Sequence, residues 1–285
     1  MMELILFSLS FLLLLIGSLT DLKWREVPDF ISFAGVALGL GINLIRSVFF
    51  WDYSFALQSV IGFAFFFALG CLLYYTAQWG GGDAKVLMAL GALIGAGWSF
   101  NGVFASFIVN VLFVTAIYSL IWLSFLAIMN WKKVSSEARV LVRSFKYFKL
   151  TNSILYSFST LVVILYLLES PFRFVALFAL CSALFLFYLS FFIRAIEVCC
   201  MQKYINVENL TEGDWIVKDV VIDSKRIAGP KDLGISKDSI RELLRLKKQN
   251  KIDTVLIKIG VPLVPSFLLA WILTWIFGNL LVKFI

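Results

Sequence analysis

The sequence predicts an all-α polytopic membrane protein with about eight transmembrane helices and a small cytoplasmic α+β insertion before the last of them. Two observations lead to this prediction. Hydrophobic residues make up 61% of the 285 positions and the mean hydropathy is +0.93, which is more apolar surface than the core of a soluble protein buries. The apolar residues also gather in stretches of the length that a bilayer core requires, about 20 residues per helix.

These apolar stretches give the expected membrane spans. They lie near residues 3–20, 29–50, 54–77, 84–100, 102–130, 153–169, 172–194 and 260–282. The first stretch begins with Met1, Met2 and Glu3, whereas a cleaved signal peptide begins with a basic region. We therefore expect the first span to remain in the mature protein.

The basic residues predict the orientation of these spans, because Lys and Arg resist translocation and collect in cytoplasmic loops. If the N-terminus lies outside, all of the 25 Lys and Arg residues except Arg46, Arg173 and Lys283 fall on the cytoplasmic side. The formal net charge of +7 is then concentrated on that face. Membrane topology alone accounts for the asymmetry, so we expect a multi-pass protein of the cell membrane and no nucleic-acid partner.

Residues 131–151 have the pattern of a basic interfacial helix inside a membrane domain that covers residues 1–200. The apolar positions at helical spacing are Val134, Ala138, Leu141, Phe145 and Phe148, and the basic positions opposite them are Lys132, Lys133, Arg139, Arg143 and Lys146. We expect the apolar stripe to lie at the headgroup boundary of the lipid bilayer and the basic face to meet anionic headgroups. Contact with a substrate is the alternative.

Residues 201–258 are the one stretch polar enough to stand in water, and they predict a small cytoplasmic module. Trp215 to Ile222 is rich in Val and Ile, as a strand would be, and Ser236 can cap a helix. A second strand at Asp253 to Ile259 leads into the C-terminal transmembrane helix, residues 259–285. A module of this size is marginal alone, so we expect it to lean on the membrane domain.

Residue types absent from the sequence exclude several classes of chemistry. The chain has no histidine, which removes the Ser-His-Asp and Cys-His arrangements and the commonest zinc ligand. Its four cysteines, Cys71, Cys181, Cys199 and Cys200, show no CxxC spacing. We therefore expect no metal and no cofactor.

Two aspartates in short cytoplasmic loops are the candidate catalytic residues. Asp21 follows the first span and Asp83 lies between the third and fourth, so both fall on the same membrane face. Two carboxyls can hydrolyse a peptide by holding one water, one as general base and the other protonated, because like charges about 3 Å apart cannot both ionise cheaply. The plainer interpretation is that each aspartate caps or solvates a helix end.

Three glycines, Gly80, Gly81 and Gly82, directly precede Asp83. Residues without a Cβ permit positive φ and let another backbone approach closely. A substrate strand lying against these glycines would place its carbonyl beside Asp83. The alternative is that they form a tight turn between two helices.

The two aspartates lie in motifs that resemble a known family. Asp21 stands in Thr-Asp-Leu-Lys-Trp-Arg-Glu-Val-Pro, and Gly80, Gly82, Asp83 and Lys85 form Gly-x-Gly-Asp-x-Lys. Both motifs resemble those of the prepilin and preflagellin peptidases, which are GxGD-type membrane aspartic proteases, and the archaeal branch in particular. The resemblance covers the first four spans and returns at 234–236 and 257–265, whereas the fifth to seventh spans share only hydrophobicity with that family.

The resemblance implies a membrane aspartic endopeptidase, a prepilin or preflagellin leader peptidase, with Asp21 and Asp83 as its catalytic pair. Such enzymes remove the short basic leader of pilin-like or archaellin-like precursors on the cytoplasmic side, just before a hydrophobic N-terminal helix. Bacterial members often carry paired CxxC motifs and N-methylate the new N-terminus. This sequence has no such motif, so methylation is not expected.

A basic leader would need acidic contacts near the catalytic pair. Glu26 and Asp29 are available beside Asp21, and with Gly80 to Gly82 and Lys85 they are the predicted substrate-binding residues. Alternatively, the two acids balance the charges of Lys23 and Arg25 at the interface.

Two other functions remain open. A presenilin-like intramembrane protease would have its first aspartate in a Tyr-Asp pair and would carry a Pro-Ala-Leu motif, and this sequence has neither. A small transporter or channel subunit would place charged or polar residues deep within its spans, or would contain paired half-length helices broken by Gly or Pro. Arg46 and Gln58 are the nearest candidates for that role, and both lie close to a span end.

Overall fold

The computed structural model describes residues 2–76, 78–97, 99, 102–144, 148–167 and 171–284. By their contacts the residues form two compact units. The first unit consists of Met1–Trp122, Asn206–Val255 and Ile259–Ile285, and the second of Leu123–Ile205 and Leu256–Lys258. The sequence predicted boundaries at residues 200 and 258, between segments in the membrane and a segment in water. That division stays a prediction, because the two units are defined by contacts between residues and not by the position of a membrane.

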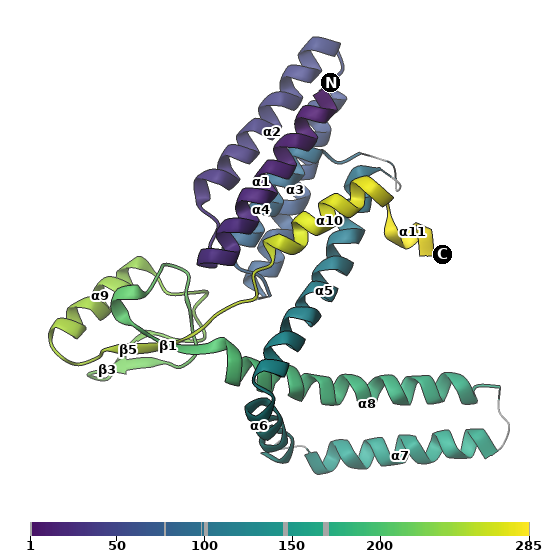
Figure 1. Cartoon of the computed structure of the whole chain (residues 1–285), viewed down its shortest axis with the longest axis vertical. Coiled ribbons are helices and arrows are strands. Elements are labelled where there is room, and N and C mark those ends of the chain that lie inside the picture. The colour runs from purple at the N-terminus through teal and green to yellow at the C-terminus, as the bar shows by residue number, and fades with distance from the viewer. Residues whose placement is uncertain are drawn as a thin grey trace. The chain divides into compact units, whose positions relative to one another are not determined.

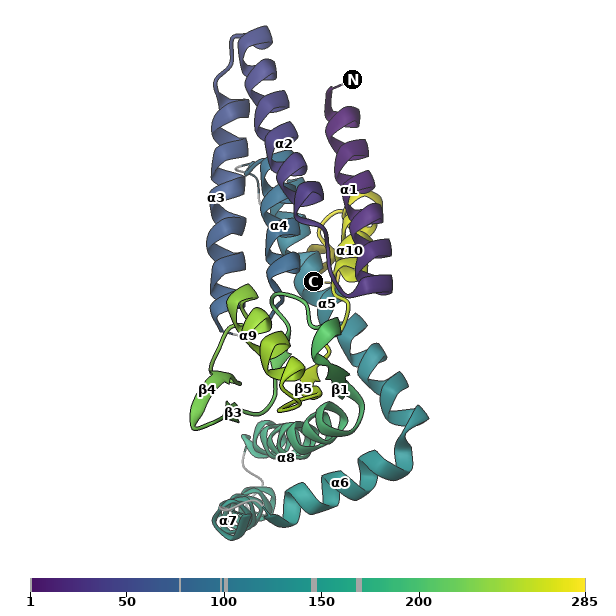
Figure 2. The same ribbon diagram turned by 90° about the vertical axis from the view of Figure 1, so that its left-hand side faces the viewer.

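The first unit is built on membrane helices from both ends of the chain. Its helices are α1 (Met2–Trp24), α2 (Asp29–Phe50), α3 (Ser54–Tyr75), α4 (Gly81–Ile94), α5 (Val103–Met129) as far as Trp122, α10 (Val264–Phe277) and α11 (Leu280–Phe284). In Figure 1 helices α1 to α4 run side by side and α10 packs against α1. Figure 2 shows α4 alongside both α2 and α3.

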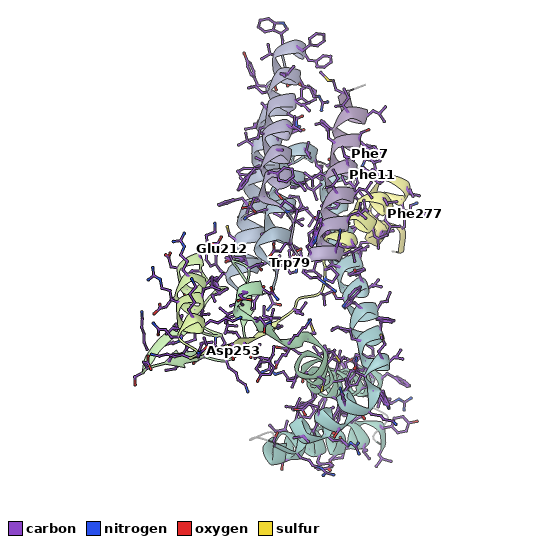
Figure 3. The ribbon with its side chains drawn as sticks, turned by 60° about the vertical axis from the view of Figure 1, so that its left-hand side comes forward. Phe7, Phe11, Trp79, Glu212, Asp253 and Phe277 are labelled. Carbon is purple, nitrogen blue, oxygen red and sulfur yellow. The ribbon has the colours of Figure 1, made fainter. Side chains whose placement is uncertain are left out.

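The core of this unit joins α10 to the N-terminal helices. Phe66, Phe107, Phe267 and Trp271 are among its largest fully buried side chains. The ring of Phe7, labelled on α1 in Figure 3, stacks on that of Trp271 with centroids 5.9 Å apart. Burying large aromatic rings in this way stabilises the contact between the first and the last long helix.

Hydrogen bonds between side chains add to the packing of α10 on α5. The amide of Asn110 donates to the Thr274 hydroxyl at 2.9 Å and to the Gly278 carbonyl at 2.8 Å. Near the other end of α10, the hydroxyls of Thr115 and Ser266 lie 2.8 Å apart. Polar pairs of this kind hold helices together where lipid supplies no hydrophobic driving force between them.

Five helices within the described part of the chain are long and apolar enough to cross a bilayer, which supports a multi-pass membrane protein. They are Met2–Trp24, Asp29–Phe50, Ser54–Tyr75, Val103–Met129 and Arg173–Met201. The predicted number of eight spans is not confirmed. Two of the predicted spans, 84–100 and 260–282, contain helices of only 14 residues, or about 21 Å.

Glycines end both of these short helices. Gly95 follows α4 with a φ of 71°, and Gly278 follows α10 with a φ of 69°. Positive φ values interrupt a right-handed helix and cost glycine least. This is the physical reason why the two helices stop before the apolar sequence does.

The polar insertion forms a small α+β module whose residues 206–255 belong to the first unit. Its elements, with the strand that precedes it, are β1 (Gln202–Asn206), the 3-10 turn η2 (Val207–Asn209), β2 (Trp215–Ile216), β3 (Val220–Ile222), β4 (Lys225–Ala228), α9 (Lys237–Lys248) and β5 (Thr254–Lys258). Strands β3 and β4 pair antiparallel, with Val221 opposite Arg226 and Ile222 opposite Lys225. The predicted strand 215–222 is thus divided into two.

The helix of this module begins as predicted and the module contacts the membrane helices. The Ser236 hydroxyl accepts a hydrogen bond from the backbone N–H of Ser239 at 3.2 Å, which caps α9. The Tyr74 hydroxyl at the end of α3 donates to the carbonyl of Leu233 at 3.0 Å. The module therefore contacts the membrane helices of the first unit, as we expected from its small size.

The second unit contains α6 (Trp131–Ser144), α7 (Phe148–Leu167), α8 (Arg173–Ile196) and the π-helix η1 (Glu197–Met201). Val134 on α6 is fully buried in a cluster with Ala195 and Ile196 at the end of α8. The apolar stripe predicted at 131–151 thus packs partly on protein. Residues 145–147, including the predicted stripe residue Phe145, lie outside the described residues.

Candidate active site

Asp21 lies in the last turn of α1 and is 6% exposed. Its Oδ2 accepts a hydrogen bond from the backbone N–H of Val264 at 3.0 Å. Val264 is the first residue of α10, and the residue before it, Leu263, has no side chain that can cap a helix. A carboxylate at this position meets an N–H group and the positive end of the helix dipole together. Asp21 therefore caps a helix that is remote in the sequence.

Asp83 lies in the first turn of α4 and is half-buried. Its Oδ2 accepts a hydrogen bond from the backbone N–H of Gly80 at 3.0 Å. An acidic side chain at the third helical position that reaches back to the N-cap N–H completes one half of a capping box. The plainer interpretation of Asp83, that it caps its own helix, is confirmed.

The two aspartates are brought together by the packing of α1 on α4. Val27, in the turn after α1, contacts both helices. A Cβ added to Gly17 of α1 would lie 3.8 Å from a Val27 methyl, and one added to Gly82 would lie 3.5 Å from the Val27 nitrogen. The negative charge of Asp21 acts directly on the Asp83 carboxyl. Two carboxyls in such a relation can divide the roles of general acid and general base.

None of the three glycines before Asp83 has a positive φ. The N-cap Gly80 is extended, with φ −72° and ψ 158°. At Gly82 the nearest neighbour of an added Cβ is the Val27 nitrogen at 3.5 Å, an ordinary van der Waals contact. Backbone conformation therefore gives no reason for glycine here, and a methyl group at Gly82 would make ordinary contact with Val27.

Lys85 and Asp29, two of the predicted substrate-binding residues, form an ion pair with each other. The Lys85 ammonium lies 2.6 Å from Oδ1 of Asp29. Their side chains are 35% and 61% exposed, so water screens the attraction. The alternative in which Asp29 balances Lys23 or Arg25 is not what the structure shows, since its partner is on α4.

Arg25 was predicted only as a charge near Asp21, and it has a more specific place. Its φ is 61°, which turns the chain out of α1, and its N–H donates to the Asp21 carbonyl at 2.9 Å. Its guanidinium donates to the Gly260 carbonyl at 3.2 Å and lies 5.1 Å from the centroid of the Trp122 ring. Arg25 thereby ties the end of α1 to the segment that leads into α10.

Glu26 has an acidic neighbour in the polar module that the sequence did not reveal. Burial raises the pKa of Asp214, the hydrogen bond from the Thr211 N–H lowers it, and the charge of Glu26 raises it further. The net pKa of Asp214 is above its ordinary value. The turn after α1 and the module therefore present negative charge to the same place.

Metal-binding groups are absent from the described part of the chain, where no three or more His, Cys, Asp and Glu side chains gather as metal ligands would. The cysteines there are free thiols. Cys199 and Cys200 both lie in η1, and the Cys200 thiol lies 3.8 Å from the Leu126 carbonyl.

The residues that build this site match known proteins. Residues 8–115 match the model of the type IV leader peptidase family. The chain is 42% identical over 81 residues to a preflagellin peptidase of Methanocaldococcus jannaschii, 33% over 90 residues to one of Methanococcus voltae, and 30% over 92 residues to a prepilin peptidase of Methanothermobacter thermautotrophicus. These stretches cover 28%, 32% and 32% of this chain and 34%, 38% and 24% of the relatives.

The chain therefore spans less than two fifths of the length of each of these relatives. The residues that match the family model nevertheless include both aspartates and the three glycines at the start of α4. The family resemblance predicted from Asp21 and from residues 80–85 is confirmed: residues 8–115, which contain both aspartates, are similar to the type IV leader peptidase family.

Proposed function

We propose that this protein is a membrane aspartic endopeptidase that removes the short basic leader from pilin-like or archaellin-like precursors at the cytoplasmic face of the cell membrane. One observation carries the proposal: Asp21 and Asp83 interact electrostatically at the ends of two packed helices, within residues similar to leader peptidases. Precursors of these two kinds are chosen because the relatives are named preflagellin and prepilin peptidases.

In the proposed reaction Asp21 and Asp83 hold one water molecule between them. The ionised carboxyl takes a proton from the water, whose oxygen forms a bond to the scissile carbonyl carbon. The protonated carboxyl polarises the carbonyl oxygen, and a proton then passes to the amide nitrogen as the C–N bond breaks. The products are the leader with a new carboxyl group and the precursor with a new N-terminus.

The cytoplasmic location is supported by the charges that flank the site. Lys23 lies in the last turn of α1 and Arg25 directly follows that helix. Lys85 lies near the start of α4, and the basic polar module contacts α3 through Tyr74. Basic loops of this kind stay on the cytoplasmic side. A precursor anchored by its hydrophobic helix presents its leader at that same surface.

Contacts to the substrate are proposed from the surroundings of the two carboxyls. Glu26 together with Asp214 would receive the basic leader, because the negative charge of Glu26 acts on the Asp214 carboxyl. The backbone of the substrate would lie against Gly80 to Gly82, which carry no side chains. Asp29 and Lys85 are proposed to join α2 to α4 instead of binding substrate.

The lipid bilayer is the second proposed partner. The basic residues of α6 include Lys132, Arg139 and Arg143, and all three are exposed. Their positive charges would meet anionic headgroups, whose attraction for basic residues near the surface is about 1 kcal/mol each.

The test is cleavage of defined precursors by the full-length protein in membranes. Candidate precursors with a basic leader and a hydrophobic helix are coexpressed with the chain, and mass spectrometry reads the new N-terminus. A matched precursor in which the basic leader residues are replaced by Gln is the control. We expect loss of the leader from the first substrate and much slower cleavage of the second. Intact precursors of all kinds, with the protein inserted in the membrane, would contradict the proposal.

A further inference from the structure

The first turn of α10 is held by residues from several parts of the first unit. Asp21 accepts the N–H of Val264, and the Thr115 hydroxyl of α5 pairs with that of Ser266 at 2.8 Å. The ring of Trp79, labelled in Figure 3, lies 5.2 Å from that of Phe267. The position of this turn is therefore set by packing and hydrogen bonds from α1, α5 and the turn before α4.

The hydrogen bond between Asp21 and Val264 serves both partners. The N-cap residue of α10, Leu263, offers no side-chain oxygen, and the hydroxyl of Ser266 donates to the Leu263 carbonyl at 2.6 Å. The N–H of Val264 thus has the carboxylate of Asp21 as its partner. Since Asp21 is 6% exposed, this donor also replaces part of the hydration that its carboxylate has lost.

The two candidate catalytic carboxyls are held in different ways. Asp83 takes its donor from Gly80, three residues away in the same turn. Asp21 takes its donor from Val264, which is 243 positions away. The hydrogen bond of Asp83 therefore stays within the turn that begins α4, whereas that of Asp21 depends on where α10 is placed.

We propose that the backbone N–H of Val264 is a positioning group of the active site, which fixes Oδ2 of Asp21 and favours its ionised form, so that Asp21 acts as the general base. This inference rests on the proposed function. The other charged or titratable groups that act on or near Asp21 are Arg25 in the turn after α1, Asp83 of α4 and Tyr118 of α5. The Thr115 hydroxyl helps to hold Val264 in place, because it pairs with the hydroxyl of Ser266 in the same turn of α10.

The direct test replaces the Val264 amide by an ester, through incorporation of the α-hydroxy analogue of valine. This removes the N–H and keeps the side chain. Because hydrogen bonds to charged groups contribute most, we expect kcat for leader cleavage to fall about 10- to 100-fold with little change in KM. The acid limb of the pH profile moves to higher pH, since the carboxylate has lost a donor. The control is an ester at Leu268, which removes an ordinary bond inside α10.

A second pair of variants uses the natural amino acids and applies if the ester protein does not fold. Thr115→Val removes a hydroxyl that holds the first turn of α10, and Thr274→Val removes one that holds its last turn. We expect Thr115→Val to lower kcat several-fold and to move the acid limb in the same direction. Thr274→Val keeps kcat within about twofold. Equal kcat values and unshifted profiles in the two variants would overturn the proposal.

A readout without substrate separates this inference from the proposed function. A hydrophobic carbodiimide reacts with protonated carboxyls, and mass spectrometry measures modification of Asp21 as a function of pH. We expect the midpoint for Asp21 to move to higher pH in the ester variant. If the unaltered protein cleaves no precursor but the midpoint moves, the positioning role stands and the proposed function fails. If the unaltered protein cleaves and neither kcat nor the midpoint changes in the ester variant, the positioning role fails alone.

Discussion

The Lys85 ammonium lies 2.6 Å from Oδ1 of Asp29, and this ion pair joins the first turns of α4 and α2. Because both side chains are partly exposed, we expect the pair to contribute about 0.2–1 kcal/mol to the free energy of unfolding, and less at high salt. Asp29→Lys and Lys85→Asp should each lower the thermal unfolding temperature, and the double exchange should restore most of it. The KM for the precursor should be raised only in the destabilised single variants and should return to normal in the stable double variant. A KM that stays raised in the stable double variant would make these residues substrate contacts.

Asp21→Asn and Asp83→Asn should each abolish leader cleavage while the protein still inserts in the membrane. Each change removes one half of the pair that moves the proton, and an amide can serve neither as base nor as acid. Cleavage is measured by the shift in precursor mass, and insertion by fractionation and protease protection. More than about a tenth of the normal rate in either variant would remove that residue from the catalytic pair.

Gly82→Ala tests whether a substrate lies against the glycines. The added methyl group would meet the Val27 nitrogen at 3.5 Å, so the free protein should keep its stability. A substrate backbone in the same place would collide with the methyl group, and we expect the cleavage rate to fall at least about tenfold. Unchanged cleavage together with unchanged thermal stability would indicate that the glycines only form a turn.

Glu26→Gln and Asp214→Asn should weaken binding of the basic leader. We expect a higher KM for the natural precursor and a smaller change for a precursor with a neutral leader, because only charge attraction is lost. Burial raises the pKa of Asp214, so on acidification this side chain loses its charge at a higher pH than an ordinary aspartate does. KM should therefore rise on mild acidification, and Asp214→Asn should reduce that rise. Equal effects on both leaders would contradict leader recognition here.

Single cysteines test on which side the site lies. In a background without Cys71, Cys181, Cys199 and Cys200, Lys23→Cys should react with a membrane-impermeant thiol reagent only after the inner face is opened. Pro171→Cys should react from outside, because the basic loops fix the orientation. Trp98→Cys is a further outside position, although Trp98 lies outside the described residues. Labelling of Lys23→Cys in intact cells would show that the orientation is the opposite of the one predicted.

Local patterns in the sequence predicted local structure well. Ser236 was expected to cap a helix and does so, because a hydroxyl before a helical stretch acts within three residues. Asp83 likewise bonds within its own turn. The ends of helices inside apolar stretches could not be predicted. The sequence has a glycine at residues 91, 95 and 97, and nothing in it indicates that Gly95 is the one with a positive φ.

Contacts remote in the sequence were beyond the same reasoning. The segment 257–265 resembled the leader peptidases, yet no pattern in it shows that the N–H of Val264 meets Asp21. Asp214 was likewise not singled out, because its nearness to Glu26 depends on how the polar module folds and on Tyr74 contacting Leu233. Sequence motifs indicate candidate catalytic residues, whereas the residues that surround them depend on the tertiary fold.

The Val264 N–H that holds Asp21 also has a consequence for biosynthesis. Asp21 emerges from the ribosome early and its donor late, since 243 positions separate them. Until α10 has been translated and inserted, the Asp21 carboxylate lacks this donor and is free to stay hydrated. Its burial is thus coupled to synthesis of α10, so nascent chains and chains cut before α10 should have an open, inactive site beside the Asp83 turn.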